Sequence, residues 1–272
     1  MDTPSLKRLL RTDELPTLPE VVGKILEVSR NDRSTVHDLA VVIEYDPALS
    51  ANLLRLVNSA YYGCTRRVVA VLDAVLLLGY DTIRALALGT SVLTSLPVSP
   101  GFQPRRFRAH SMGCAVVARA IAERFGHPQA EQALAAGLLH DMGALLLAVR
   151  LPDKPYGGGE GMTPAEEIEI FGFTHPEAGG RLARHWNFET DLVAAIQGHH
   201  LTEAPLSTQH PLARLVFLAE WLTRDQFQFD GKPIITSHEP AAVAASLGYD
   251  LGELEELTRG LPALDPASYE KG

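Results

Sequence analysis

The sequence has little cysteine and no excess of basic residues. Only two cysteines, Cys64 and Cys114, occur among the 272 residues, far apart and in no Cys-x-x-Cys pair. This spacing excludes a disulfide framework and a zinc ribbon, and we expect both to be small buried residues. The formal net charge of −9 at pH 7 argues against bulk binding to DNA or RNA, which needs clustered lysine and arginine.

Long uncharged apolar runs are also missing. No run of about 18 such residues occurs, and the N-terminus, MDTPSLKRLLRTDELP, lacks the apolar core of a secretory signal. We therefore expect a cytoplasmic protein without a membrane segment. Because 46% of the residues are hydrophobic, the chain can bury one large core or two modest lobes.

No alternating strand pattern of useful length occurs, and apolar residues recur at helical spacing nearly throughout. Several residues mark the expected helix ends. We expect N-caps at Ser34 or Thr35, at Asp46 before Pro47 and at Asp81, and helix stops near Gly63 and at Gly79. Asn58, Ser59 and Tyr62 are expected to shape the fold, because Asn and Ser near a helix end bond to the backbone; a functional use is the alternative.

Two segments rich in proline and glycine interrupt the helices. SLPVSPGFQP, residues 95–104, is predicted to join two lobes, and LPDKPYGGGEGMT interrupts the second half of the chain. Two short helices are expected near the end, at 240–247 and 250–259. The predicted fold is all-α, with one helical lobe over 12–100, a second over 105–225 and a helical extension over 226–272.

Histidine placement is the most informative feature of the second lobe. Five of the ten histidines form four stations along the chain: His110, His140, His175 and the pair His199 and His200. Successive stations are 30, 35 and 24 residues apart, about one helical hairpin each. Antiparallel helices of a bundle can therefore bring all four stations to one end of its core.

His140 is followed directly by Asp141, inside the apolar segment GLLHDMGALLLA. Two adjacent ionisable groups in a buried helix need a partner, because an unpaired buried charge is costly. Imidazole with carboxylate suits a divalent transition metal (Fe, Mn, Zn, Co or Ni) better than Ca²⁺ or a lone Mg²⁺. Neighbouring residues on a helix project about 100° apart, so other helices must complete the shell of a shared ion.

These residues resemble the HD superfamily of metal-dependent phosphohydrolases. GLLHDMG stands between His110 and the later His175, the His199 and His200 pair and Glu220. The first lobe points to one family within this group, because it is similar to the HDOD domain family. The similar segments are LPTLPEVVGKILEV, DPALSANLLRLVNSAYYG and VLDAVLLLGYDTIRALALG. The resemblance covers residues 12–225. It implies an all-α fold with an HD-type bundle in the second lobe, and its bacterial members are mostly regulatory signalling proteins.

The resemblance also implies roles for single residues. His110, His140 and Asp141 would bind a metal, and Glu220 stands where the HD pattern usually has its closing aspartate. In the two-metal branch that hydrolyses cyclic dinucleotides, further histidines occupy stations like His175, His199 and His200, and Asp141 can bridge two ions.

Alternatives remain at three of these positions. Asp141 could instead orient a ligand histidine, and Glu220 could lie on a helix surface beside Trp221. His199 and His200 share one station, and which of them binds is open.

Three departures from the HD pattern count against catalysis. The lysine often found three residues after the HD aspartate is replaced by Ala144, which removes a cation that would stabilise phosphate charge. Arg106 lies one turn before His110, where some two-metal relatives have a glutamate; its charge would weaken ion binding, although it could hold a phosphate. The segment after His200, LTEAP, lacks the Gly-Tyr-Pro signature of cyclic di-GMP phosphodiesterases.

Three functions follow as hypotheses. The first is a stand-alone regulatory protein without efficient catalysis, which senses one or two metal ions or a nucleotide and contacts signalling proteins through helical surfaces. The second is a metal-dependent phosphodiesterase for a nucleotide or cyclic dinucleotide, with Asp141 and Arg106 in the reaction. The third is a helical adaptor with an empty site. The signalling role rests on the resemblance alone, because fold does not imply function.

Overall fold

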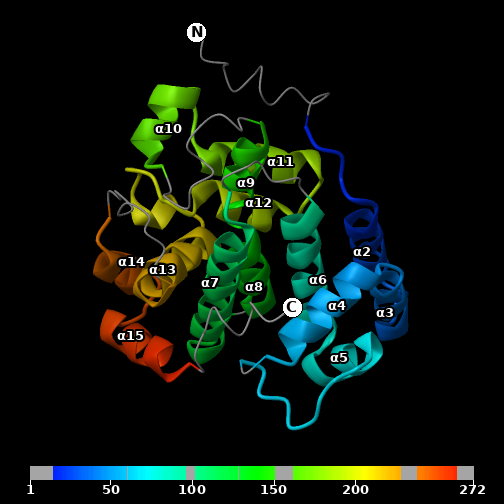
Figure 1. Cartoon of the computed structure of the whole chain (residues 1–272). Coiled ribbons are helices and arrows are strands. Elements are labelled where there is room, and N and C mark those ends of the chain that lie inside the picture. The colour runs from blue at the N-terminus through cyan, green and yellow to red at the C-terminus, as the bar shows by residue number, and fades with distance from the viewer. Residues whose placement is uncertain are drawn as a thin grey trace. The chain divides into compact units, whose positions relative to one another are not determined.

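The structure of the chain is a computed structural model (Figure 1). It describes residues 15–59, 61–95, 102–127, 129–150, 162–227 and 238–261. All regular elements in these ranges are helices, so the predicted all-α class is confirmed. The chain divides into a first unit, Leu18–Ser95, and a second unit, to which the described residues of Met1–Thr17 and Leu96–Gly260 belong. Most of the predicted joint at 95–104 and of LPDKPYGGGEGMT lies outside the described residues.

The first unit is built from packed helices around an aliphatic core. In chain order they are α2 (Glu20–Arg30), α3 (Val36–Glu44), α4 (Pro47–Val57), α5 (Val71–Leu78) and α6 (Tyr80–Ser95). α6 packs against each of the other four. Its Ile83 and Leu86 are fully buried, together with Ile25, Leu39 and Leu53 of the surrounding helices.

Short-range contacts of cap residues set three of the helix ends in this unit. Thr35, one of the two expected N-caps, caps α3 in a reciprocal pair with Asp38. Asp46 accepts two backbone N–H groups at the start of α4, and Pro47 is its first residue. Gly79, with φ 90°, ends α5, because that backbone conformation suits glycine. These predicted ends are confirmed.

Two predicted ends in the first unit are wrong. α4 ends at Val57 rather than near Gly63, because the Asn58 side chain donates to Leu54 O and pairs with both backbone groups of Val68. This pairing confirms Asn58 as a residue that shapes the fold. α6 already begins at Tyr80, so Asp81 lies in its first turn and is no cap.

The second unit is a larger helical assembly. Its helices are α7 (Pro104–Arg124), α8 (Ala130–Leu139), α9 (Met142–Arg150), α10 (Pro164–Phe171), α11 (His175–His185), α12 (Thr190–Gly198), the short 3-10 helix η2 (Leu206–Thr208), α13 (Pro211–Phe227), α14 (Pro240–Ser246) and α15 (Leu251–Gly260). α8 and α13 each pack against α7 and α12, and α11 packs against α9 and α12. The two short helices expected at the end are confirmed as α14 and α15, which pack against α13 and α7.

Two glycines let the helices around GLLHDMG approach closely. A Cβ on Gly137 of α8 would lie 2.5 Å from Ala115 Cα of α7. A Cβ on Gly143 of α9 would collide with the backbone oxygen of His175 on α11. Any side chain at either position would push these helices apart. The glycines at the two ends of the motif therefore hold together the helices that carry its histidines.

The apolar stretch around this motif belongs to the core. Ala130–Val149 has the length and hydropathy of a membrane span, but 78% of it is buried inside the structure. The core helix of a globular protein meets the same criteria, and this stretch carries His140 and Asp141 at its turn between α8 and α9.

Candidate metal centre

The histidine stations predicted from the sequence come together inside the second unit. His110 lies in α7, His140 follows α8, His175 begins α11, and His199 with His200 follows α12. His140 and His199 are fully buried, and His110 and His175 are no more than 5% exposed. Five helices thus bring imidazoles and carboxylates to one place, because α13 packs against α7, α8 and α12, and α12 packs against α11.

One half of the cluster joins α7 to the turn after α8. His110 Nε2 lies 3.2 Å from His140 Nε2. The Oδ2 atom of Asp141 lies 3.7 Å from His110 Nε2 and 3.3 Å from His140 Nε2.

The other half joins α11 to the end of α12. His175 Nε2 lies 3.2 Å from His199 Nε2. The Oδ1 atom of Asp141 lies 3.2 Å and 3.6 Å from these two nitrogens. His200 offers a ring nitrogen within 4.8 Å of those of His175 and His199, and its Nε2 is 3.9 Å from Glu220 Oε2. The two oxygens of Asp141 therefore face different pairs of imidazoles.

Hydrogen bonds on the outer side of three rings determine their tautomers. His140 Nδ1 is 2.8 Å from Gly137 O, and His199 Nδ1 is 2.8 Å from Ile196 O. A carbonyl oxygen only accepts, so each Nδ1 carries a proton, and in the neutral form each ring points its Nε2 lone pair into the cluster. His175 Nδ1 is held in the same way by Glu167 Oε1 at 2.6 Å. Metal-ligating histidines are oriented by such bonds, so the donor set fits a metal ion.

Burial keeps two of the rings neutral. It lowers the pKa of His199 to about 4, and the nearby His140 and His175 act in the same direction. Burial, followed by the charge on neighbouring His199, holds the pKa of His200 well below its usual value. Near pH 7 both imidazoles are therefore in the unprotonated form that binds a metal.

The carboxylates attract positive charge into the cluster. Burial opposes protonation of His140 and His175, but Asp141 raises the pKa of His140 to about 8, and Glu167 with Asp141 raises that of His175 to about 10. Burial also disfavours ionised Asp141, but His140 and the other imidazoles hold the pKa of its carboxyl well below its usual range. A divalent ion supplies the same positive charge by displacing the imidazole protons.

Glu167 is a site residue that the sequence analysis misses. It is fully buried in α10, and besides holding the His175 ring it accepts the His175 backbone N–H through Oε2 at 2.7 Å. The segment TPAEEIEIFG contains three glutamates, and residue type alone does not distinguish them. The available signal is spacing, since Glu167 lies one helical turn before the buried Phe171.

The structure also places four other residues that the sequence singles out. Glu220 is 6% exposed, so the alternative that places it on a helix surface is wrong. Arg106 is half-buried in the first turn of α7, and its guanidinium donates to Gln103 Oε1 at 3.3 Å. Cys114 is fully buried as expected, whereas Cys64 is only half-buried, and its thiol donates to Val57 O at 3.4 Å.

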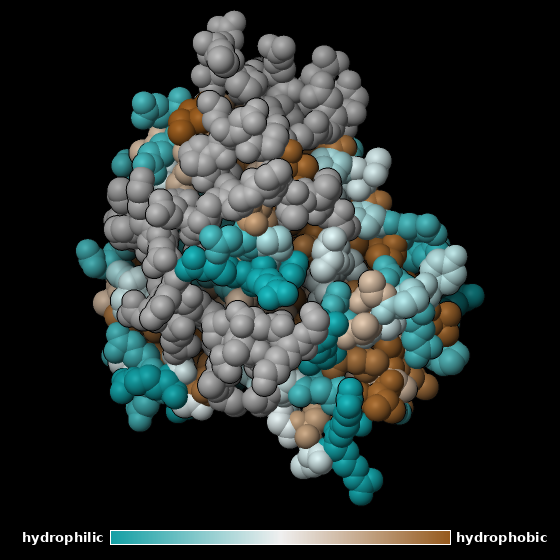
Figure 2. All heavy atoms as spheres, in the orientation of Figure 1, coloured by the Kyte–Doolittle hydropathy of each residue, from teal (hydrophilic) through white to brown (hydrophobic). Residues whose placement is uncertain are grey.

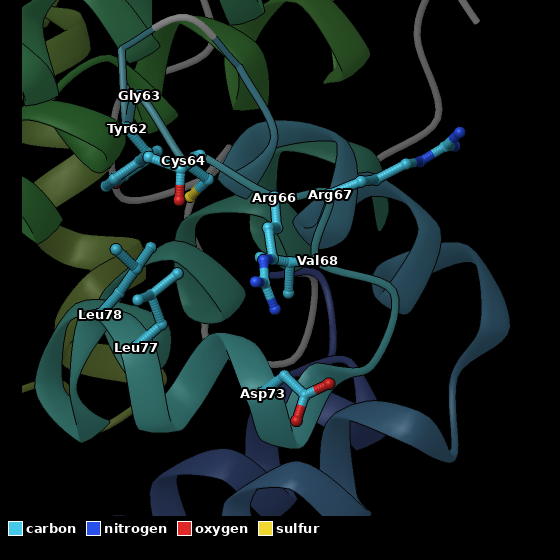
Figure 3. A pocket seen from close by; sticks show the side chains of 10 residues that line it. Tyr62, Gly63, Cys64, Arg66, Arg67, Val68, Asp73, Leu77 and Leu78 are labelled. Carbon is cyan, nitrogen blue, oxygen red and sulfur yellow. The ribbon is translucent and has the colours of Figure 1, made fainter.

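The first unit holds a cavity of about 590 Å³ between the segment 62–68 and α5 (Figure 3). Leu77 and Leu78 of α5 face Tyr62 and Cys64 across it. The Arg66 side chain points toward α5, which also contributes Asp73, so this cavity combines an apolar wall with charged side chains.

Comparison with known proteins places the chain in a family. The HDOD domain matches residues 15–202. An uncharacterised protein of Treponema pallidum (strain Nichols) is 28% identical over 229 residues, which are 79% of this chain and 43% of that protein. The chain thus spans less than half the length of this relative.

Two solved structures are similar over almost the whole chain. One is a Shewanella amazonensis SB2B protein whose name assigns it to the phosphohydrolases; it is 29% identical, with a TM-score of 0.76, and the match covers 99% of each chain. The other is an HDOD domain protein of unknown function from Geobacter sulfurreducens, 26% identical, with a TM-score of 0.73 and 97% and 96% of the two chains covered. With its all-α fold and its match to the HDOD domain over residues 15–202, the chain belongs to the HDOD domain family.

Proposed function

We propose that the second unit binds two divalent transition-metal ions and, through them, acts in the cytoplasm on a phosphoester ligand such as a nucleotide or cyclic dinucleotide. The observation that carries this proposal is the two-sided Asp141, whose Oδ2 faces His110 and His140 and whose Oδ1 faces His175 and His199. A carboxylate between two sets of ring nitrogens suits a pair of ions held close together.

Two sets of side chains would hold the ions. His110, His140 and Asp141 would hold the first ion, and Asp141 with His175, His199 and His200 would hold the second; Glu220 lies beside His200. The ion is Fe, Mn, Zn, Co or Ni, because nitrogen donors predominate. Bound ions of this kind supply Lewis acidity toward a phosphoester.

Other groups of the protein would orient the ligand histidines and contact the phosphate. Glu167 fixes the ring of His175, and the carbonyls of Gly137 and Ile196 fix those of His140 and His199. The lysine of the HD pattern is replaced by Ala144, so a phosphate needs another cation. Arg106, one turn before His110, is our candidate for that contact.

The test is elemental analysis of the protein, prepared without a metal-binding tag, followed by phosphodiester hydrolysis assays. We expect about two ions per chain and metal-dependent turnover. His140→Ala should lose at least one ion and the activity, while circular dichroism stays unchanged. His185→Ala, at the far end of α11 from His175, is the matched control and should keep both. A wild-type protein that binds no offered metal would refute the proposal; bound metal without turnover would refute its hydrolytic part.

A second candidate function is regulation through protein partners, and the surface of the first unit favours it. α3 exposes Val41 by 50%, Tyr45 directly after α3 is 74% exposed, and the segment leading into α5 exposes Val69 by 71%. Figure 2 shows hydrophobic side chains on the face of the first unit that it displays. Exposed apolar side chains that form a contiguous patch are typical of protein interaction sites.

Site-specific cross-linking inside the cell tests this candidate. A photoreactive residue at Leu76, which is 66% exposed, should capture a signalling protein, whereas the same residue at exposed Glu27 of α2 should not. Equal capture at both positions, or at neither, would argue against a docking role for this surface.

A further inference from the structure

Cys114 lies against the half of the metal centre that contains His110 and His140. It is fully buried and follows His110 by one helical turn on α7, so the two side chains share a face. Cys114 Sγ is 3.7 Å from His110 Nε2. Cys114, His110 and His140 each offer a donor atom, and these atoms all lie within 4.8 Å of one another.

The separations among the donor atoms of His110, His140 and Asp141 fit one small ion. Donor atoms around a tetrahedral zinc-sized ion are about 3.3 to 3.8 Å apart. The two histidine nitrogens are 3.2 Å apart, Asp141 Oδ2 is 3.7 Å and 3.3 Å from them, and Cys114 Sγ is 3.7 Å from His110 Nε2. Sγ is also 4.0 Å from His110 Nδ1, so the sulfur lies beside the His110 ring, and it lies within 4.8 Å of the donor nitrogen of His140.

We propose that Cys114 is a thiolate ligand of the first ion, beside His110, His140 and Asp141. The inference rests on the proposed function, because it adds a ligand to that centre. On binding, a metal–sulfur bond forms and the thiol proton leaves to solvent, with no change of oxidation state.

A thiolate ligand at the first site makes the two ion sites chemically different. A soft thiolate favours zinc or cobalt over manganese. The second site, formed by His175, His199, His200 and Asp141, offers only nitrogen and oxygen, and the other cysteine of the chain, Cys64, belongs to the first unit. We therefore infer a zinc-preferring first site and a less selective second site.

Thr223 of α13 lies next to Cys114 and can form a hydrogen bond with its sulfur in both the thiol and the thiolate form. Thr223 Oγ1 lies 3.3 Å from Cys114 Sγ and also within 2.8 Å of Ala219 O and 3.0 Å of Glu220 O. Toward a thiol this hydroxyl accepts a hydrogen bond. Toward a thiolate it can turn its proton to the sulfur, an outer hydrogen bond of the kind that supports metal ligands.

The test loads the whole protein with Co²⁺ and records three quantities: metal content, the visible bands of bound cobalt, and the near-ultraviolet charge-transfer band that appears only with a thiolate ligand. We expect the wild type to show the charge-transfer band. Cys114→Ser keeps the size of the side chain and its contact with Thr223, and should lose that band while it keeps visible cobalt bands. Its zinc affinity at one site should fall about tenfold or more. Cys64→Ser is the control and should match the wild type.

The outcomes separate the two proposals. Bound cobalt without a charge-transfer band in the wild type overturns Cys114 as a ligand and leaves the metal centre standing. A band that survives in Cys114→Ser, or an unchanged zinc affinity there, overturns it as well. A wild type that binds no metal at all overturns the metal centre and this inference with it.

Discussion

The two units of the molecule differ in what they bury and in what they expose. Among the described residues, the buried polar side chains of the first unit are the neutral Thr82, Thr90 and Ser91. The second unit buries charged and titratable groups: His110, His140, Glu167, His175, His199, Arg214 and Glu220. Large exposed apolar side chains show the opposite distribution. Of those in the described ranges, all but Ile168 lie in the first unit: Val36, Val41, Tyr45, Val69, Leu76 and Leu77.

This contrast indicates that the two units have different functions. Buried titratable groups are costly, so a cluster of them persists where a function needs it. Exposed apolar side chains in contiguous patches are typical of docking surfaces. We infer that chemistry belongs to the second unit and partner contact to the first.

The largest effect should come from removing the charge shared by both halves of the centre. Asp141→Asn keeps the shape of the side chain but offers a neutral amide to both imidazole pairs, so we expect the loss of both ions and at least a hundredfold loss of any phosphoester turnover, on the order of a missing metal ligand. Elemental analysis after dialysis against Mn²⁺ or Zn²⁺ measures the ions. Asp191→Asn changes a half-exposed carboxylate of the same unit and should retain them. Two ions retained in Asp141→Asn would show that the carboxylate does not bridge.

The next largest effect should come from a substitution that disturbs the close helix packing around the centre. Gly143→Ala places a methyl group against the backbone of His175, so α9 and α11 must separate. We expect a loss of about 3 kcal/mol in the free energy of unfolding, typical of severe overpacking, and a weakened second ion site. Gly260→Ala is the control, because a Cβ there meets nothing within 4 Å. Urea titration of both variants gives the difference, and equal midpoints would contradict this account of GLLHDMG.

A smaller effect should follow from Glu167, which reaches an ion only through His175. Glu167→Gln removes the charge that holds the ring, and we expect about a 10- to 100-fold weaker second site with the first site unchanged. Isothermal titration with Mn²⁺ resolves the two sites. Glu169→Gln, two residues along on the exposed side of α10, should bind as the wild type does. Equal weakening in both variants would mean that the loss is general and does not act through His175.

The sequence predicts those parts of the fold that depend on near neighbours. Thr35, Asp46 and Gly79 act within one helical turn, so residue type and spacing suffice to place them. The end of α4 could not be predicted in the same way. It depends on Asn58 meeting Val68 ten residues later, a contact that exists only once the intervening segment has folded back.

The same distinction applies to the metal centre. The histidines could be predicted because their type and order resemble a known pattern. Glu167 has the same side chain as Glu166 and Glu169, and only packing makes it the buried one. The position of Cys114 one turn after His110 is visible in the sequence, but its contact with Thr223 spans 109 residues. Contacts of that range need the assembled helices.

The smallest effect on stability should come from a substitution on the exposed apolar surface of the first unit. Leu77 is 58% exposed and lies on α5 beside the cavity of the first unit (Figure 3). Leu77→Glu removes apolar contact area without opening a core cavity, so the free energy of unfolding should change by no more than about 0.5 kcal/mol. The metal content should stay that of the wild type, because the centre belongs to the second unit. If the first unit docks a partner through this surface, cross-linking from Leu76 should disappear in the same variant. A destabilised protein would show instead that Leu77 belongs to the core, and unchanged cross-linking would move the docking surface to the exposed residues of α3.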